Sequence, residues 1–294
     1  MPPAAERFPV RVAACQLRIK AGDPDANRAA AAAAIEDAAR HGAKIVVLPE
    51  LTPSGYVFAT ADEARSLGEP ADGPTARRWS ALAAEHDLVV IGGFAELAAD
   101  GTLRNSSMLV DADGVRAVYR KAHLWDAEAD FFVPGDQPPP VVGTRYGRLS
   151  MMICYDVEFP EWVRLPALAG AELLAVPANW PAGEVPAGER PMVTVNVQAA
   201  AFANRMFVVA ACRCGEERGV RWVGGSIIAG PDGYPLAGPA SLDRLSGDAG
   251  RAAEEILIAG CDLPDARSKA TGPRNDAHAD RRPALYGPAG LAAS

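Results

Sequence analysis

The sequence predicts an α/β fold in which helices cover a mixed sheet or two stacked sheets. Apolar segments of strand length alternate with helical segments, and hairpins stand between some of them. Three of the apolar segments end on Glu50, Lys121 and Cys154, respectively. Because α/β folds place their chemistry at strand ends, where a rigid sheet fixes the side chains, these three residues predict a catalytic site.

The first elements alternate most clearly. Residues 10–17 are rich in β-branched and small residues, which indicates a strand. The mostly alanine segment 27–40 predicts a helix, because an Asp-Pro pair at 23–24 favours a helix start and a glycine soon after the segment favours a stop. A buried strand is expected over 44–48, directly before Glu50.

The remaining elements follow from the same periodicity and turn signals. We expect a helix over 74–86, a buried strand over 88–94, a hairpin of 107–110 with 115–119, the strand 148–153 before Cys154, strands over 172–176, 205–211, 225–229 and 256–261, and a helix near 193–204. The segments 134–143 and 181–188 are rich in Pro and Gly and are expected to be loops.

Composition limits the class of protein. We expect one domain over 1–294, with a core over about 10–262 and an extended polar tail over about 266–294. The net charge of −8 argues against a nucleic-acid partner, and no apolar stretch approaches the roughly 20 residues of a membrane span. Residues 1–7 lack a secretory signal, and five cysteines with scattered spacing fit free thiols in a reducing cytoplasm.

The chemistry of the three strand-end residues suits a cysteine hydrolase. A thiol becomes a useful nucleophile only as the thiolate, so it needs a nearby base or cation. Glu50 can take the proton of Cys154, since partial desolvation raises the pKa of a carboxylate. Lys121 would stabilise the negative charge of a tetrahedral intermediate, together with a backbone N–H just after Cys154.

Several segments resemble signatures of the carbon–nitrogen hydrolase (nitrilase) superfamily. Three of them carry the predicted site and occur in the family's order, namely 48–50 (LPE), 119–124 (YRKAHL) and 153–161 (ICYDVEFPE). Three more are similar to other family segments, namely 128–135 (EADFFVPG), 176–180 (VPANW) and 230–233 (GPDG). The spacing of 33 residues from Lys121 to Cys154 also resembles the family's, and the likeness extends from about residue 10 to about residue 286.

The resemblance implies a fold and roles for the site residues. It implies an αββα four-layer sandwich that pairs into an αββα–αββα homodimer, with the tail reaching the partner. It implies that Glu50 is the general base, Lys121 the cation beside the oxyanion and Cys154 the nucleophile. Glu128 would be a fourth polar catalytic residue, with Asp130 as the competitor for that role. No metal and no organic cofactor is implied.

Residues in loops beside these motifs are candidates for substrate binding. They are Tyr56, Trp125, Tyr155, Glu158, Asn179 and Trp180. Glu158 could pair an amine of the substrate or bind Arg164. His123 could lie at the pocket edge or serve the structure alone. Cys212 and Cys214 favour buried strand cysteines over a metal site, because no second pair at ligand spacing follows.

The motif set is most similar to that of short-chain aliphatic amidases such as 5-aminopentanamidase. The resemblance therefore implies hydrolysis of a small aliphatic primary amide to a carboxylic acid and ammonia through a thioester on Cys154. Nitrile hydrolysis and hydrolysis of N-carbamoyl amino acids or amines are the alternatives. A catalytically inactive interaction protein on the same fold is a third, which the intact Glu50, Lys121 and Cys154 disfavour.

Overall fold

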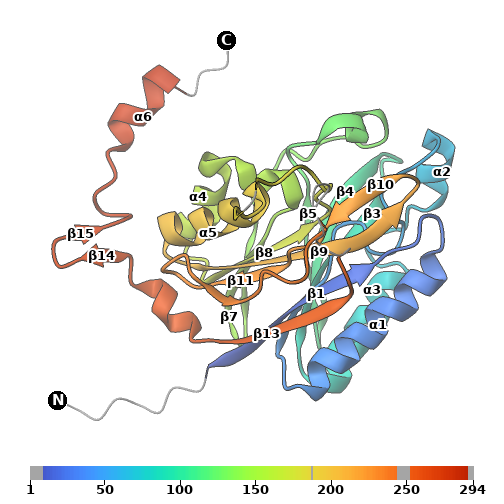
Figure 1. The fold of residues 1–294 in the computed structure, drawn as a ribbon, viewed down its shortest axis with the longest axis horizontal. Helices are drawn as coiled ribbons and strands as arrows, with labels where there is room; N and C mark the ends of the chain where they lie inside the picture. Colours follow the sequence, from blue (N-terminus) through green and yellow to red (C-terminus); the bar gives the residue numbers. More distant parts are fainter. Residues whose placement is uncertain (1–8, 187, 244–251, 291–294) are drawn as a thin grey trace.

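A long mixed sheet forms the centre of the fold, and two groups of helices cover its outer faces (Figure 1). This computed structural model describes residues 9–186, 188–243 and 252–290. Residues 1–7, where no secretory signal is expected, therefore lie outside the described residues. The main path of the sheet runs β5-β4-β3-β2-β1-β9-β8-β7-β6.

The strands and helices have the following bounds. The strands of this sheet are β1 Val10–Arg18, β2 Ile45–Val47, β3 Val89–Leu97, β4 Leu103–Asp111, β5 Gly114–Arg120, β6 Val141–Thr144, β7 Gly147–Met151, β8 Leu173–Ala178, β9 Phe207–Glu217, β10 Val220–Val223, β11 Ile227–Ala229, β12 Pro235–Ala237 and β13 Glu255–Cys261. The α-helices are α1 Pro24–Arg40, α2 Ala61–Ser66, α3 Pro74–His86, α4 Pro160–Leu168, α5 Met192–Asn204 and α6 Pro283–Gly290. Short 3₁₀ helices span Asp126–Asp130, Cys154–Glu158 and Leu263–Arg267.

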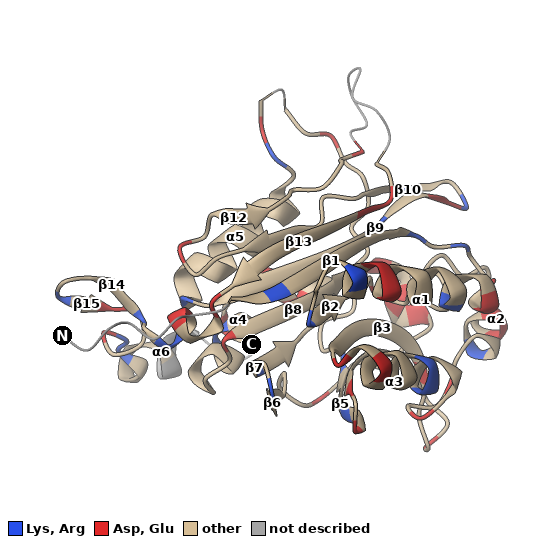
Figure 2. Cartoon of the chain, turned by 90° about the horizontal axis from the view of Figure 1, so that it is seen from below, with Lys and Arg blue, Asp and Glu red and all other residues tan. Residues whose placement is uncertain are grey.

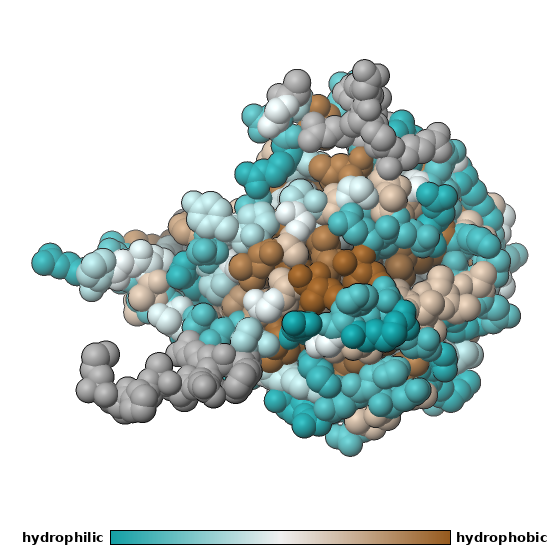
Figure 3. All heavy atoms as spheres, turned by 60° about the horizontal axis from the view of Figure 1, so that its bottom comes forward, coloured by the Kyte–Doolittle hydropathy of each residue, from teal (hydrophilic) through white to brown (hydrophobic). Residues whose placement is uncertain are grey.

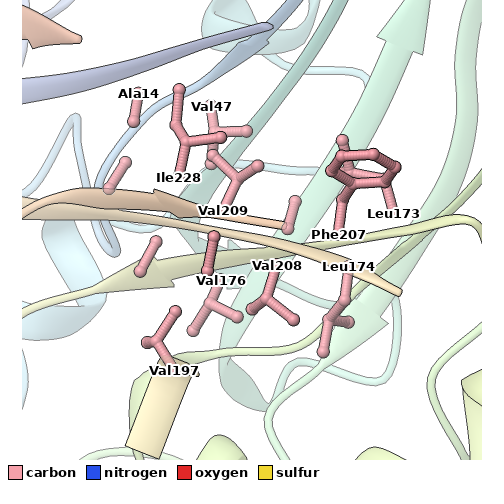
Figure 4. Close-up of a cluster of buried hydrophobic side chains, with 14 of the residues drawn as sticks. Ala14, Val47, Leu173, Leu174, Val176, Val197, Phe207, Val208, Val209 and Ile228 are labelled. Carbon is pink, nitrogen blue, oxygen red and sulfur yellow. The ribbon is translucent and has the colours of Figure 1, made fainter. Parts of the chain in front are cut away.

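Side-chain alternation along the strands produces the four layers. The sheet has a first half, β1 to β5, and a second half, β6 to β9. In β1, Ala13 and Cys15 belong to the apolar cluster under α1 and α3, whereas Val12 and Ala14 belong to the cluster between the two halves. Figure 4 shows the same division in the second half, where Val209 points toward the first half and Val208 toward α5. The order α1/α3, first half, second half, α4/α5 is the predicted αββα sandwich.

Strand direction brings the carboxyl ends together. β1, β2 and β3 are parallel, and β5 shares their direction because β3, β4 and β5 form an antiparallel meander. In the second half β7, β8 and β9 are parallel. The halves meet where β1 pairs in parallel with β9, so both carboxyl edges face the same end of the molecule.

The predicted elements are largely confirmed, with boundary shifts of a few residues. The alanine-rich helix begins earlier than expected, at Pro24, because the Asp23 side chain caps it by accepting from the backbone N–H of Ala26. The expected loop 134–143 was wrong at its end, where β6 pairs with β7. α4 was missed because it begins at one proline and contains another, Pro166, although proline is favourable in a first helical turn.

The remaining surface carries two features. Charges of both signs lie along α1 and α3 (Figure 2). Between α1 and β13 lies a groove of about 720 Å³, lined by both apolar and charged residues, beside the half-buried Ile256 and Ile258 on the face shown in Figure 3. In the part of the chain that the structure describes, no helix is long and apolar enough to cross a membrane.

The predicted tail is more regular than expected. After residue 267 it forms the two-stranded ribbon of β14 Ala270–Gly272 and β15 Asn275–Asp276 and then α6, and it extends away from the layered body (Figure 1). The extent of one domain over 1–294 stays a prediction.

Candidate active site

The carboxyl edge of the sheet holds the residues that the sequence singled out. Glu50 lies three residues after β2, Lys121 directly after β5 and Cys154 three residues after β7. All three are buried, with 0%, 1% and 6% of their surfaces exposed. The two halves of the sheet therefore contribute to one enclosed group of polar side chains.

Lys121 is the centre of this group. Its Nζ lies 2.9 Å from Glu50 Oε1 and 2.6 Å from Glu128 Oε1. Burial is the largest influence on the pKa of Lys121 and lowers it, but Glu50, Cys154 and Glu128 together raise it above its ordinary value. The ammonium therefore stays charged between the two carboxyl groups.

Glu50 is held at one oxygen and open at the other. Besides Lys121, Oε1 accepts a hydrogen bond of 2.7 Å from Asn105 Nδ2, and Asn179 Nδ2 donates to the backbone oxygen of Glu50 at 2.9 Å. Within the described residues, the buried Oε2 has no hydrogen-bond partner. A buried, unpaired carboxylate oxygen can accept a proton from a reacting group.

Cys154 begins a 3₁₀ turn rather than ending a strand, since β7 stops at Met151. Its φ of 47° is left-handed, a conformation that costs a non-glycine residue roughly 1–3 kcal/mol and is common at active sites. Burial and then Glu50 raise the pKa of the thiol, against the lowering effects of Lys121 and the backbone N–H of Asn179. The resting sulfur is therefore a thiol that needs a base.

The buried carboxylate of Asp156 holds this turn in place. Asp156 accepts from the backbone N–H of Ile153 at 3.1 Å and from the Tyr119 hydroxyl at 2.8 Å. His123 Nδ1 lies 2.7 Å from the other Asp156 oxygen, and its ring stacks on Phe159. Of the two possibilities left open for His123, this geometry favours the structural one.

Glu128 and Asp130 occupy different environments. Glu128 is buried and accepts from the Tyr56 hydroxyl at 2.5 Å as well as from Lys121, whereas Asp130 is exposed. Burial and then Glu50 raise the pKa of Glu128, while Lys121 lowers it. The structure thus brings Glu128, and not Asp130, into contact with Lys121.

A cavity of about 250 Å³ opens beside Glu128. Two of the residues predicted to bind substrate, Tyr56 and Trp125, line it. The remaining lining residues are Val57, Phe58, Asp126, Ala127, Glu128, Phe131, Phe132, Pro181, Val220 and Trp222.

The other four predicted binding residues lie outside this lining. Asn179 and Trp180 are buried. Asn179 Nδ2 donates to the backbone oxygen of Glu50, and the Trp180 backbone N–H donates to Cys212 Sγ. Tyr155 is half-buried against Phe159, and Glu158 is exposed. Arg164, the structural partner considered for Glu158, instead donates to the backbone oxygen of Ala203.

Sequence reasoning missed a buried ion pair that supports the cavity. Arg213 Nη1 lies 2.8 Å from Glu217 Oε2, and the Glu217 carboxylate accepts from the backbone N–H groups of Tyr56 and Val57. Gly55 is required here, because its φ is 80° and an added Cβ would stand 2.3 Å from Glu217 Oε1. An arginine and a glutamate four residues apart in an apolar strand are the signal that could have revealed the pair.

Two further cysteines, Cys212 and Cys214, lie in surroundings that suit a structural role. Cys212 and Cys214 are buried in β9, and burial is the main reason that the pKa of each thiol is raised. Across residues 9–186, 188–243 and 252–290, no group of three or more His, Cys, Asp or Glu side chains could hold a metal ion.

Comparisons with known proteins agree with the geometry. The family model of the carbon-nitrogen hydrolases matches residues 11–271. A protein described as a nitrilase from Pyrococcus abyssi is 34% identical over 278 residues, which cover 94% of this chain and 99% of the relative. The N-carbamoylputrescine amidase of Solanum lycopersicum is 34% identical over 297 residues, covering 94% and 93%.

Solved structures of an amidase from Nesterenkonia sp. are also similar. One crystal structure has a TM-score of 0.73 at 27% identity and covers 96% of each chain. A variant of the amidase from Nesterenkonia sp. AN1 has a TM-score of 0.70 at 28% identity and covers 87% of this chain and 96% of that one. Its structure shows Michael addition of acrylamide at its active-site cysteine.

Proposed function

The chain belongs to the carbon–nitrogen hydrolase family, and on that premise we propose that it is an amidase acting on a small aliphatic primary amide. Members of this group are hydrolases of carbon–nitrogen bonds, and amidases stand among the relatives. The observation that carries the proposal is the buried Lys121, which bridges Glu50 and Glu128 at the carboxyl edge of the sheet. Cys154 follows β7 at the same edge.

Acylation uses each of these groups in turn. Glu50 Oε2 takes the proton of Cys154, and the sulfur forms a bond to the amide carbon while the carbonyl π electrons move to oxygen. Lys121 and the backbone N–H of Tyr155 stabilise that oxyanion. When the intermediate collapses, the carbon–nitrogen bond breaks and Glu50 returns its proton to the leaving nitrogen, which departs as ammonia.

Hydrolysis of the thioester then repeats the pattern with water. Glu50 deprotonates the water, and the water oxygen bonds to the thioester carbon. The carbon–sulfur bond then breaks and Glu50 returns the proton to the sulfur, which leaves the carboxylic acid and the Cys154 thiol. Glu128 takes no proton in this route. It keeps Lys121 in place and balances its charge.

Replacing Cys154 with alanine is expected to abolish ammonia release from every substrate, because the proposed route begins with attack by its sulfur. Ammonia is measured with a panel of small amides, nitriles and N-carbamoyl compounds. Cys261→Ala is the matched control, since Cys261 is also buried but lies at the end of β13, and it should retain activity. Ammonia release that persists in Cys154→Ala would exclude the thioester mechanism.

The same panel separates the alternative functions. A nitrile carbon or an N-carbamoyl group can be attacked by the same sulfur, and the relatives from Pyrococcus abyssi and Solanum lycopersicum carry those descriptions. Preferential turnover of nitriles or of N-carbamoyl compounds would assign that activity to the chain instead. A wild-type protein that releases no ammonia from any compound of the panel would favour the inactive interaction protein.

We further propose a homodimer in the cytoplasm. α4 and α5 form an outer layer on which Leu165, Leu168, Met192 and Phe202 are exposed, and such apolar patches are typical of protein interfaces. All five cysteines are free thiols, as expected in a reducing compartment. Light scattering is expected to give twice the mass of the chain, and a monomeric mass would contradict the pairing.

A further inference from the structure

We propose that the cavity beside Glu128 is the acyl-binding pocket and that it selects apolar acyl groups over anionic ones. This inference rests on the proposed amidase function and adds the class of acyl group to it. The cavity begins one side chain from the reacting groups, because Glu128 lines it and contacts Lys121 Nζ at 2.6 Å. The proposal places the substrate carbonyl beside Lys121 and its acyl chain in this space.

The lining favours apolar groups. Six of its residues are aromatic, namely Tyr56, Phe58, Trp125, Phe131, Phe132 and Trp222. Four more are the apolar Val57, Ala127, Pro181 and Val220. A space of about 250 Å³ corresponds to roughly eight water volumes, so the displaced water and the buried acyl carbons both favour binding.

The charges of the lining disfavour an anionic acyl group. Its ionisable carboxyl groups are Asp126 and Glu128, and no lysine or arginine is part of it. A carboxylate on the substrate would lose its hydration and face like charge without a cation to bind. The Tyr56 hydroxyl cannot compensate, since it already donates to Glu128.

The walls are braced, so the pocket cannot easily rearrange around a different group. The Trp222 ring packs edge-on against Tyr56 at 5.2 Å and lies under the Arg213 guanidinium at 4.8 Å. Arg213 is itself paired with Glu217, which also holds the backbone of Tyr56. In the same lining, Phe58 packs edge-on against Phe131 and Phe132.

A matched pair of amides tests the selection. 5-Methylhexanamide has the shape of glutaramate without its charge. We expect 5-methylhexanamide to exceed glutaramate in kcat/KM by at least tenfold, and each added CH₂ that enters the pocket to raise kcat/KM about fourfold. Equal or higher kcat/KM for glutaramate would overturn the proposal.

A reversed charge in the wall gives a second test. Val220→Lys places a cation in the lining and is expected to raise the glutaramate/5-methylhexanamide ratio of kcat/KM at least tenfold. Val115→Lys, at an exposed valine of β5 outside the lining, should leave that ratio unchanged. An unchanged ratio in folded Val220→Lys would contradict the assignment of the pocket.

Binding separates this inference from the proposed function. 5-Methylhexanamide and glutaramate are titrated calorimetrically into Cys154→Ala, in which no turnover is expected. Tighter binding of the neutral amide supports the pocket even if the wild type hydrolyses another class of compound. Equal Kd values for the two amides would overturn the pocket while leaving the amidase function standing.

Discussion

Replacing Glu50 with glutamine is expected to lower kcat for amide hydrolysis by about 10²–10⁴-fold, the range typical for loss of a general base. Glutamine has the same shape and can still accept from Asn105 Nδ2 and Lys121 Nζ, so the surrounding hydrogen bonds are preserved. It cannot take the proton of Cys154, whose pKa is raised by burial and would remain raised. Steady-state ammonia release from the preferred amide measures kcat directly.

The control for this substitution is a buried glutamate far from the site. Glu172 directly precedes β8, so it lies at the amino end of that strand, away from the carboxyl edge that holds the site. Its carboxylate pairs with Arg267. Glu172→Gln therefore removes a comparable buried charge and should leave kcat unchanged. If Glu50→Gln kept more than a tenth of wild-type kcat with an unchanged melting temperature, another group would have to be the base.

Much of this site could be predicted because local sequence specifies strand ends. The segment 45–50 is apolar until it reaches Glu50, and the segment around Cys154 has the same form. Strand ends at one edge of a parallel sheet must lie together, so a correct reading of the elements places their terminal side chains in one region. Glu128 was predicted from the resemblance rather than from the pattern, because it lies on a 3₁₀ turn without periodicity.

The residues that were missed depend on pairing between distant segments. Asn105 contacts Glu50 only because β4 lies beside β3, and Glu217 reaches Tyr56 across 161 positions of the chain. Trp222 becomes a pocket wall through the short ribbon of β9 and β10. None of these contacts leaves a periodic signal, since each depends on register and loop course. The same reason explains why four of six predicted binding residues lie outside the lining.

Lys121→Met is expected to reduce both catalysis and stability. Loss of the cation beside the oxyanion should lower kcat by about 10²–10³-fold, as does loss of an oxyanion-stabilising donor elsewhere. Methionine fills a similar volume but leaves Glu50 and Glu128 buried without the shared ammonium, which should lower the free energy of unfolding by about 3–5 kcal/mol. Chemical denaturation measures this loss, and initial rates measure kcat.

The stability loss should depend on pH in a defined direction. The pKa of Glu128 is already raised by burial and by Glu50, and removal of Lys121 takes away the largest of the effects that lower it. A carboxyl with a raised folded-state pKa binds its proton more tightly in the folded state, so the variant should gain stability as pH falls through that pKa. Wild-type Lys121 stays charged throughout pH 5–8, since its pKa is above 10.5. The stability difference between the two proteins should therefore be smaller at pH 5 than at pH 8.

Combining Lys121→Met with Glu128→Gln separates the structural role of the lysine from its catalytic role. Glutamine removes one of the two like charges, so the double variant should recover part of the lost stability at pH 8 and lose most of its pH dependence. Its kcat should stay as low as that of Lys121→Met, because no cation stands beside the oxyanion. Recovery of kcat along with stability would mean that Lys121 serves only to hold the two carboxylates together. A loss of stability that is equal at both pH values and unchanged in the double variant would show that Glu50 and Glu128 do not repel each other once the lysine is gone.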